Sequence, residues 1–312
     1  MSVLSRPYFH DEEKAFEYLE SVIWADGKVC PHCGGLDRLT KVKANTAKRI
    51  RLGLYRCGDC KKQFTVKVGT VFEHMRLPLN KALQALYMMT SSKKGISAHQ
   101  LHRTLEITYK SAWFLAHRIR EAMRTGALAP FGGEGGVVEV DETFIGRKAG
   151  ITVKNAYHHK MAVLSLVHRE SGAVRSFVVE KANMEHMLPI VIANIDRETY
   201  IMTDESTAYP KRLRSVFLGH GRVNHGKGEY VRGRVYTNTI EGYFSIFKRG
   251  FKGIYQHCAE KHLHRYMAEY DFRYTNREAN GFNDGQRSVE ALKGIVGKRL
   301  TYQQADCSQD HA

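Results

Sequence analysis

The chain has 312 residues, enough for two or three compact units, and its apolar fraction of 43% is ordinary for a globular protein. A formal net charge of +16 favours a nucleic-acid partner over a membrane surface, with a basic but inert surface as the plain alternative. No apolar run approaches the roughly 18 residues that a membrane span needs. The acidic, polar first twenty residues are unlike a secretory signal, so we expect a cytoplasmic protein.

Four of the six cysteines form two matched pairs within residues 1–75, "CPHC" (Cys30, Cys33) and "CGDC" (Cys57, Cys60). Zinc prefers four tetrahedral thiolate ligands, and each CxxC turn presents two of them. Redox-active pairs are the alternative, but two matched pairs in a basic segment favour one structural Zn²⁺ in a zinc ribbon. The basic residues around it, which would grip a phosphate backbone or simply be solvated, are Lys41, Lys43, Lys48, Arg49, Arg51, Arg56, Lys61 and Lys62.

Residues 76–126 show three helical patterns in succession. The second and third begin after Ser97 and Thr108, which are good N-cap residues, and a short turn at 105–107 joins them. These dimensions match a helix-turn-helix, although three-helix units are also common in proteins that do not bind DNA. The neighbouring zinc ribbon and the net charge favour a DNA-binding unit. A glycine-rich loop then separates this unit from the rest of the chain.

Residues 134–285 change to alternating, β-branched patterns separated by helical ones. The predicted strands are 137–146, 160–168, 173–180, 200–206 and a short one within 221–225, and the predicted helices are 184–195, 208–216, 238–251 and 260–278. This order predicts an α/β domain with a mixed sheet and flanking helices. Residues 286–312 are predicted to be a polar C-terminal tail.

Asp141 and Asp204 are charged residues in two predicted strands of this domain. A carboxylate inside a buried strand is costly unless a cation compensates it. Either aspartate alone would more often be a structural strand-end residue. Together, with a third acid on a nearby helix, they match a site for two Mg²⁺ ions, or Mn²⁺ in their place, that catalyses phosphoryl transfer. Glu139 shares the strand face of Asp141 and is a minor candidate for the same site.

Three stretches, "VVEVDETFIGRK", "IMTDES" and "VNHGKGEYVRGRVYTNTIEGYFSIFKRGFKGIYQH", resemble the catalytic domain of bacterial insertion-sequence transposases. Those enzymes belong to the DDE superfamily, have an RNase H-like fold, and in this branch carry an N-terminal zinc ribbon. The resemblance covers residues 15 to about 280. It implies that Asp141 and Asp204 are the first two metal-binding acids and that Lys248 contacts DNA. His225 matches, more weakly, a histidine near the site.

The third acid of that family lies in the "TNTIEG" stretch, where its members carry either Glu or Asn. A helical wheel of 238–251 gives an apolar stripe that must face the sheet, formed by Ile240, Phe244, Phe247 and Phe251. Glu241 and Lys248 lie at the border of this stripe, and Asn238 lies further round. We therefore favour Glu241 as the third metal ligand, with Asn238 as the alternative. A capping box formed by Asn238 and Glu241 is the purely structural alternative.

The sequence thus predicts a DDE-type transposase, a DNA strand-transferase and nuclease that is nucleoid-associated in the cell. Its partners would be double-stranded DNA, at terminal inverted repeats and at target sites, and further copies of itself, since the resemblance implies a homodimer or higher assembly. Two alternatives stay open. One is a DNA-binding regulator with an inactive RNase H-like domain, and the other is a structure-specific nuclease that cuts DNA without joining it.

Overall fold

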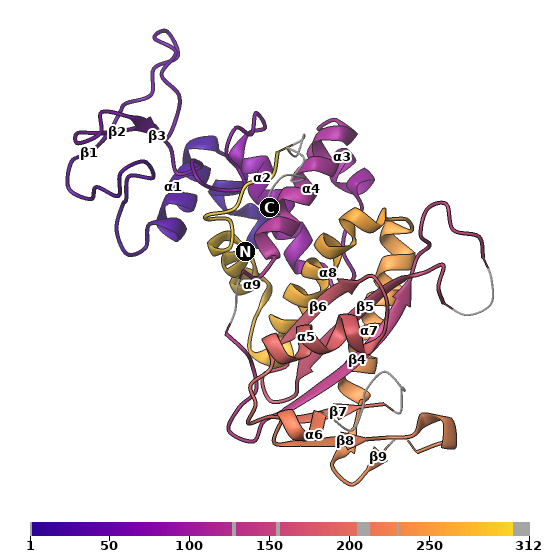
Figure 1. The fold of residues 1–312 in the computed structure, drawn as a ribbon. Coiled ribbons are helices and arrows are strands. Elements are labelled where there is room, and N and C mark those ends of the chain that lie inside the picture. The colour runs from indigo at the N-terminus through magenta and orange to yellow at the C-terminus, as the bar shows by residue number, and fades with distance from the viewer. Residues whose placement is uncertain (1, 127–128, 154–156, 205–212, 230, 302–312) are drawn as a thin grey trace, which may run out of the picture. The chain divides into compact units, whose positions relative to one another are not determined.

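The computed structural model describes residues 2–126, 129–153, 157–204, 213–229 and 231–301. The chain divides into two compact units (Figure 1). Unit 1 comprises Met1–Arg124 together with Asn283–Ala312, and unit 2 comprises Thr125–Phe282. Within the described ranges, no helix combines the length and the apolar character that crossing a membrane requires.

Unit 1 is a group of helices with a small antiparallel sheet of strand order β1-β2-β3. Its helices and strands are α1 (Glu12–Ile23), β1 (Leu39–Lys41), β2 (Tyr55–Cys57), β3 (Gln63–Phe64), α2 (Leu79–Ser91), α3 (Ala98–Leu105), α4 (Tyr109–Met123) and α9 (Asp284–Lys293). The hydroxyl of Tyr55 donates to Glu20 of α1 at 2.8 Å, which fastens the small sheet to the helices. The expected ribbon followed by a helical unit is therefore present.

Helices α3 and α4 are the pair in which the sequence predicts a helix-turn-helix. The hydroxyl of Ser97 accepts a hydrogen bond from the backbone N–H of Gln100, and that of Thr108 accepts one from Ser111, so both predicted N-caps are confirmed. Glu106 takes the left-handed conformation (φ 52°) that ends α3. Their role in DNA binding stays a prediction.

Residues 284–293 form α9, where the sequence predicts a polar tail from residue 286. Asn283 and Gln286 form a capping box at its start, and Arg287 donates to the backbone carbonyl of Thr90 in α2 at 3.1 Å. Leu292 and Ile295 are fully buried. The segment predicted to be a tail therefore begins with a helix of unit 1. Residues 302–312 of the predicted tail lie outside the described residues.

Unit 2 is built on a five-stranded mixed sheet of order β6-β5-β4-β7-β8 (Figure 1). Its strands and helices are β4 (Val137–Ile145), β5 (Met161–His168), β6 (Val174–Val179), α5 (Met184–Asn194), β7 (Tyr200–Thr203), α6 (Leu213–Val216), β8 (Gly219–Arg222), β9 (Val231–Arg232), β10 (Val235–Tyr236), α7 (Asn238–Gly250) and α8 (Glu260–Thr275). The pairs β4–β5 and β5–β6 are antiparallel, and β4–β7 and β7–β8 are parallel. This is the RNase H-like arrangement that the sequence predicts. Residues 205–212 lie outside the described part. They include the end of the predicted strand 200–206 and the start of the predicted helix 208–216.

The alternation of side chains along β4 decides which helices each of them meets. Val138 and Val140 belong to the hydrophobic core that α5 completes. Ile145 belongs to the other core, which the predicted stripe of α7 and several residues of α8 complete. Because alternate residues share a face, Glu139 and Asp141 lie on the side of Ile145, toward α7 and α8. The acidic residues of β4 therefore face the helix that carries Glu241.

Candidate active site

Asp141 and Asp204 occupy equivalent positions on two neighbouring parallel strands. Val137 pairs with Tyr200 and Glu139 pairs with Met202 in the register of β4 and β7. Asp141 follows Glu139 by two residues, and Asp204 follows Met202 by two, directly after β7 ends. Since neighbouring strands are about 4.8 Å apart, this register brings the two aspartates side by side where β7 ends, in the middle of the sheet.

Several carboxylates converge around Asp141. Burial raises the pKa of Asp141 well above its usual range, the Asp204 carboxylate raises it further, and Glu142 and Glu241 add to the rise. The backbone N–H of Glu142 donates to Asp141 at 2.8 Å and partly opposes it. The first turn of α7 therefore brings Glu241 near Asp141. Such a concentration of negative charge suits a divalent cation, which would favour the charged forms of these acids.

Lys248 lies near Asp141, two turns after Glu241 on α7. Burial lowers the pKa of Lys248, the Asp141 carboxylate opposes that change, and Lys252 and Lys160 reinforce it. Lys252 belongs to the π-helical turn Phe251–Tyr255 that follows α7, and Lys160 directly precedes β5. Neither is among the residues that the sequence singled out. Only the spacing of four from Lys248 to Lys252 offered a signal, whereas the approach of Lys160 depends on the fold.

Two other predicted residues, Asn238 and His225, stay candidates. Asn238 is the first residue of α7, and it is exposed. His225 begins the 3₁₀ turn His225–Lys227, and its side chain lies outside the described residues.

The capping-box alternative for Asn238 and Glu241 is wrong. The N-cap residue of α7 is Thr237, and its side chain makes no capping hydrogen bond. Instead, a residue of β4 accepts a hydrogen bond at the start of α7. Oε2 of Glu139 accepts it from the backbone N–H of Ile240 at 2.9 Å. Glu139 is fully buried, and Nε of Arg169 donates to its other oxygen at 2.6 Å. Both oxygens of Glu139 are thus engaged, one by Arg169 and one by the N-terminus of α7.

The four cysteines of the ribbon form a compact cluster. The Sγ atoms of Cys30 and Cys60 are 3.7 Å apart, as are those of Cys33 and Cys57, and all four lie within 4.8 Å of one another. A tetrahedral site with Zn–S bonds of about 2.3 Å has an edge of about 3.8 Å. Among the described residues, this is the one group of three or more candidate ligands with such close spacing. The arrangement fits a structural zinc ion.

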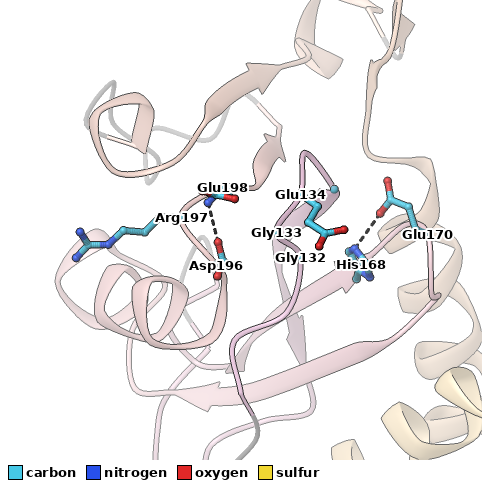
Figure 2. A pocket seen from close by; sticks show the side chains of 9 residues that line it. Gly132, Gly133, Glu134, His168, Glu170, Asp196, Arg197 and Glu198 are labelled. Carbon is cyan, nitrogen blue, oxygen red and sulfur yellow. Dashed lines mark hydrogen bonds and ion pairs between the residues drawn. The ribbon is translucent and has the colours of Figure 1, made fainter.

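A separate open pocket of about 890 Å³ lies where β4 and β7 begin, away from Asp141 and Asp204 (Figure 2). His168 and Glu170 face one another across 2.9 Å, and Asp196 accepts the backbone N–H of Glu198 at 2.8 Å. None of the predicted site residues lines this pocket. The cluster of acids around Asp141, with Lys248 nearby, is therefore kept as the candidate active site.

The RNase H-like sheet and the four-cysteine ribbon are the architecture that the resemblance to DDE transposases implies. Residues 134–275 match the ISXO2-like transposase domain, and residues 10–63 match the transposase zinc-ribbon domain. The chain is therefore similar to ISXO2-like transposase domains over its sheet domain and to transposase zinc ribbons over its four-cysteine unit.

Individual proteins are also similar to this chain. An uncharacterized protein in transposable element ISH50 of Halobacterium salinarum is 28% identical over 263 residues, which are 77% of this chain and 83% of that protein. Since this relative is archaeal, it does not support the bacterial part of the resemblance. A chain of the simian T-cell lymphotropic virus intasome structure matches with a TM-score of 0.30 and 17% identity, over 61% of this chain and 65% of that one, which is less than two thirds of its length.

Proposed function

We propose that this protein is an active transposase that cuts DNA at the ends of its element and joins those ends to target DNA. The observation that carries the proposal is that Asp204, Glu241 and Lys248 all lie near Asp141, where β7 of the RNase H-like sheet ends. A structural role alone would not explain why three separate elements each bring an acid to one place. The carboxylates of these acids repel one another unless a cation lies between them, which supports a metal-dependent reaction.

Asp141, Asp204 and Glu241 would hold two Mg²⁺ ions, with Mn²⁺ as a substitute and Asn238 as the alternative third ligand. Bound Mg²⁺ supplies acidity to an attacking hydroxyl and neutralises the charge that develops on a leaving oxygen. In cleavage, water attacks the phosphorus, and the bond to O3′ breaks to free a 3′-hydroxyl. In joining, that hydroxyl attacks a target phosphodiester and releases a target 3′-hydroxyl. No covalent bond to the protein is required.

Basic side chains would hold the DNA during both steps. Lys248 stands next to the acids, where its ammonium group would meet the non-bridging oxygens of the scissile phosphate, and Lys160 and Lys252 would extend that contact along the backbone. In unit 1, the zinc ribbon and the α3–α4 pair would bind the terminal inverted repeats. Zinc held by Cys30, Cys33, Cys57 and Cys60 would keep the ribbon folded. Paired ends would require a dimer or a higher assembly.

A three-part assay separates this proposal from its alternatives. DNA binding, cleavage of an end substrate, and joining of a precut end to supercoiled plasmid are measured with Mg²⁺. We expect all three activities from the wild-type protein. Binding without cleavage would identify a regulator with an inactive domain, and cleavage without joining would identify a nuclease. Either result would overturn the proposal.

A further inference from the structure

Glu139 is a fully buried carboxylate on the central strand of the sheet, two residues before Asp141. A buried charge is costly unless other groups compensate it. Here both oxygens are used. Oε1 accepts from Nε of Arg169 at 2.6 Å, and Oε2 accepts the backbone N–H of Ile240 at 2.9 Å. The second contact places a negative charge at the N-terminus of α7, where the helix dipole favours it.

Arg169 ties a third element to this pair. Its guanidinium donates to the carbonyl oxygens of Arg234 (3.0 Å) and Tyr236 (2.5 Å) and lies 3.5 Å from the centre of the Tyr236 ring. Tyr236 lies in β10, the last strand before α7, and Arg234 directly precedes that strand. The Glu139–Arg169 pair therefore fixes both the start of α7 and the segment that leads into it.

The same contacts control where Glu241 stands. Ile240, whose N–H binds Glu139, is the residue directly before Glu241, and Asp141 follows Glu139 on the same face of β4. Asp141 is thus connected to Glu241 by two residues of β4, the hydrogen bond from Ile240 to Glu139, and the peptide bond between Ile240 and Glu241. Every step along it is buried or part of regular structure, so a small change in the reach of Glu139 would move Glu241 relative to Asp141.

We propose that Glu139 and Arg169 are positioning residues that set the spacing between α7 and β4, and thereby the affinity of the acid site for divalent metal. This inference rests on the proposed metal-binding role of Asp141 and Glu241. If the pair served stability alone, altering it would lower the melting temperature and leave metal affinity in the folded protein unchanged.

Glu139→Asp is the sharpest variant, because it keeps the negative charge and shortens the side chain by one methylene. A changed metal affinity would then report position and not charge. Arg169→Lys is the milder second variant, since it keeps the positive charge and loses the fork that holds Arg234 and Tyr236. Glu12→Asp is the matched control. Glu12 also holds a helix N-terminus, because its carboxylate accepts the backbone N–H groups of Leu79 (2.7 Å) and Asn80 (3.0 Å) at the start of α2, in unit 1.

Two readouts that need no activity are used with the full-length, zinc-loaded protein. Free Mn²⁺ is followed by electron paramagnetic resonance during titration, and amide hydrogen exchange is followed in the segment that contains Ile240. We expect Glu139→Asp to weaken Mn²⁺ binding roughly ten- to hundred-fold and to speed exchange at Ile240. Arg169→Lys should shift both in the same direction, and Glu12→Asp should shift neither.

Strand transfer by Glu139→Asp should recover when Mn²⁺ or Mg²⁺ is raised, which a general loss of folded protein would not allow. Wild-type exchange at Ile240 together with wild-type Mn²⁺ affinity in both variants would overturn the positioning role. If the variants shift both readouts while the wild-type protein never joins DNA, the positioning role stands and the proposed function fails. If Glu139→Asp does not fold, Arg169→Lys decides the question on the same criteria.

Discussion

Among the charged side chains around Asp141, Asp204 raises the pKa of Asp141 most. The relationship follows from the parallel register of β4 and β7, which places both aspartates two residues beyond the paired positions Glu139 and Met202. α7 then adds Glu241 from outside the sheet. The candidate site thus combines two acids fixed by the sheet with a third acid fixed by how α7 is held.

The choice between Glu241 and Asn238 can be tested directly. We expect Glu241→Gln to lower strand transfer by roughly a hundred-fold or more, because it removes a charge that would stabilise the metal ions. Asn238→Ala should have a small effect, since it removes no charge and the N-terminus of α7 is capped by Glu139. Initial rates of plasmid joining under excess Mg²⁺ measure both. A large loss from Asn238→Ala with little loss from Glu241→Gln would reverse the assignment.

The lysines beside the acids are predicted to contact DNA phosphates. Lys160→Ala and Lys252→Ala should each weaken DNA binding and reduce the slope of log K against log salt by about 0.9, the value for one lost phosphate contact. Fluorescence anisotropy at several salt concentrations measures the slope. Lys293→Ala is the control, because Lys293 is exposed and paired with Glu290 in α9. Unchanged slopes in the first two variants would remove these lysines from the interface.

The ribbon is predicted to depend on zinc for its fold. Trp24 packs its ring edge-on to Tyr55 at 5.2 Å between ring centres, next to the cysteine cluster. In a Trp113→Phe background, Trp24 is the remaining tryptophan, and its fluorescence reports on the ribbon. We expect one zinc per chain by metal analysis, and a red shift of Trp24 emission when a strong chelator removes it. An unshifted spectrum after complete zinc loss would contradict a structural role for the metal.

Asp271 makes the stability of unit 2 depend on pH. Burial raises the pKa of Asp271 from 3.8 to about 6, although hydrogen bonds from Tyr243 and Ser176 oppose the rise. The folded state therefore holds this proton more tightly than the unfolded state does. The resulting stabilisation is fully present below pH 3.8 and is lost as the pH rises through about 6.

The loss corresponds to at most about 3 kcal/mol in the free energy of unfolding. Asp271→Asn cannot titrate, so the wild-type protein should lose stability relative to this variant between pH 4 and pH 7. Urea unfolding of both proteins at the two pH values measures the difference. A difference between the two proteins that does not change with pH would show that Asp271 does not titrate in this range.

Much of unit 2 could be predicted from local patterns. Alternation in β4 and the apolar stripe of α7 both reflect burial of one face, and both are confirmed by the two hydrophobic cores. The two aspartates could be found because a charge in a buried strand needs a compensating partner. Alternation alone, however, places Glu139 and Asp141 on one face and cannot say which of them meets a helix N–H.

The remaining features depend on contacts between distant parts of the chain. Lys160 and Lys248 come together only when β5 and α7 are packed in the same unit. α9 was missed because its partner Thr90 is almost two hundred residues away, and its own sequence has few apolar residues. Local periodicity carries no information about such pairs.

The central claim is that the acid cluster joins DNA, and strand transfer tests it most directly. A precut element end is incubated with supercoiled plasmid and Mg²⁺, and joined product is compared for the wild-type protein, Asp204→Asn and Glu198→Gln. Glu198 is an exposed acid of the same unit in the separate pocket, so its variant matches the change in charge. The account predicts joined product from the wild type and Glu198→Gln, and none from Asp204→Asn despite unchanged DNA binding. Joining by Asp204→Asn at the wild-type rate would contradict it.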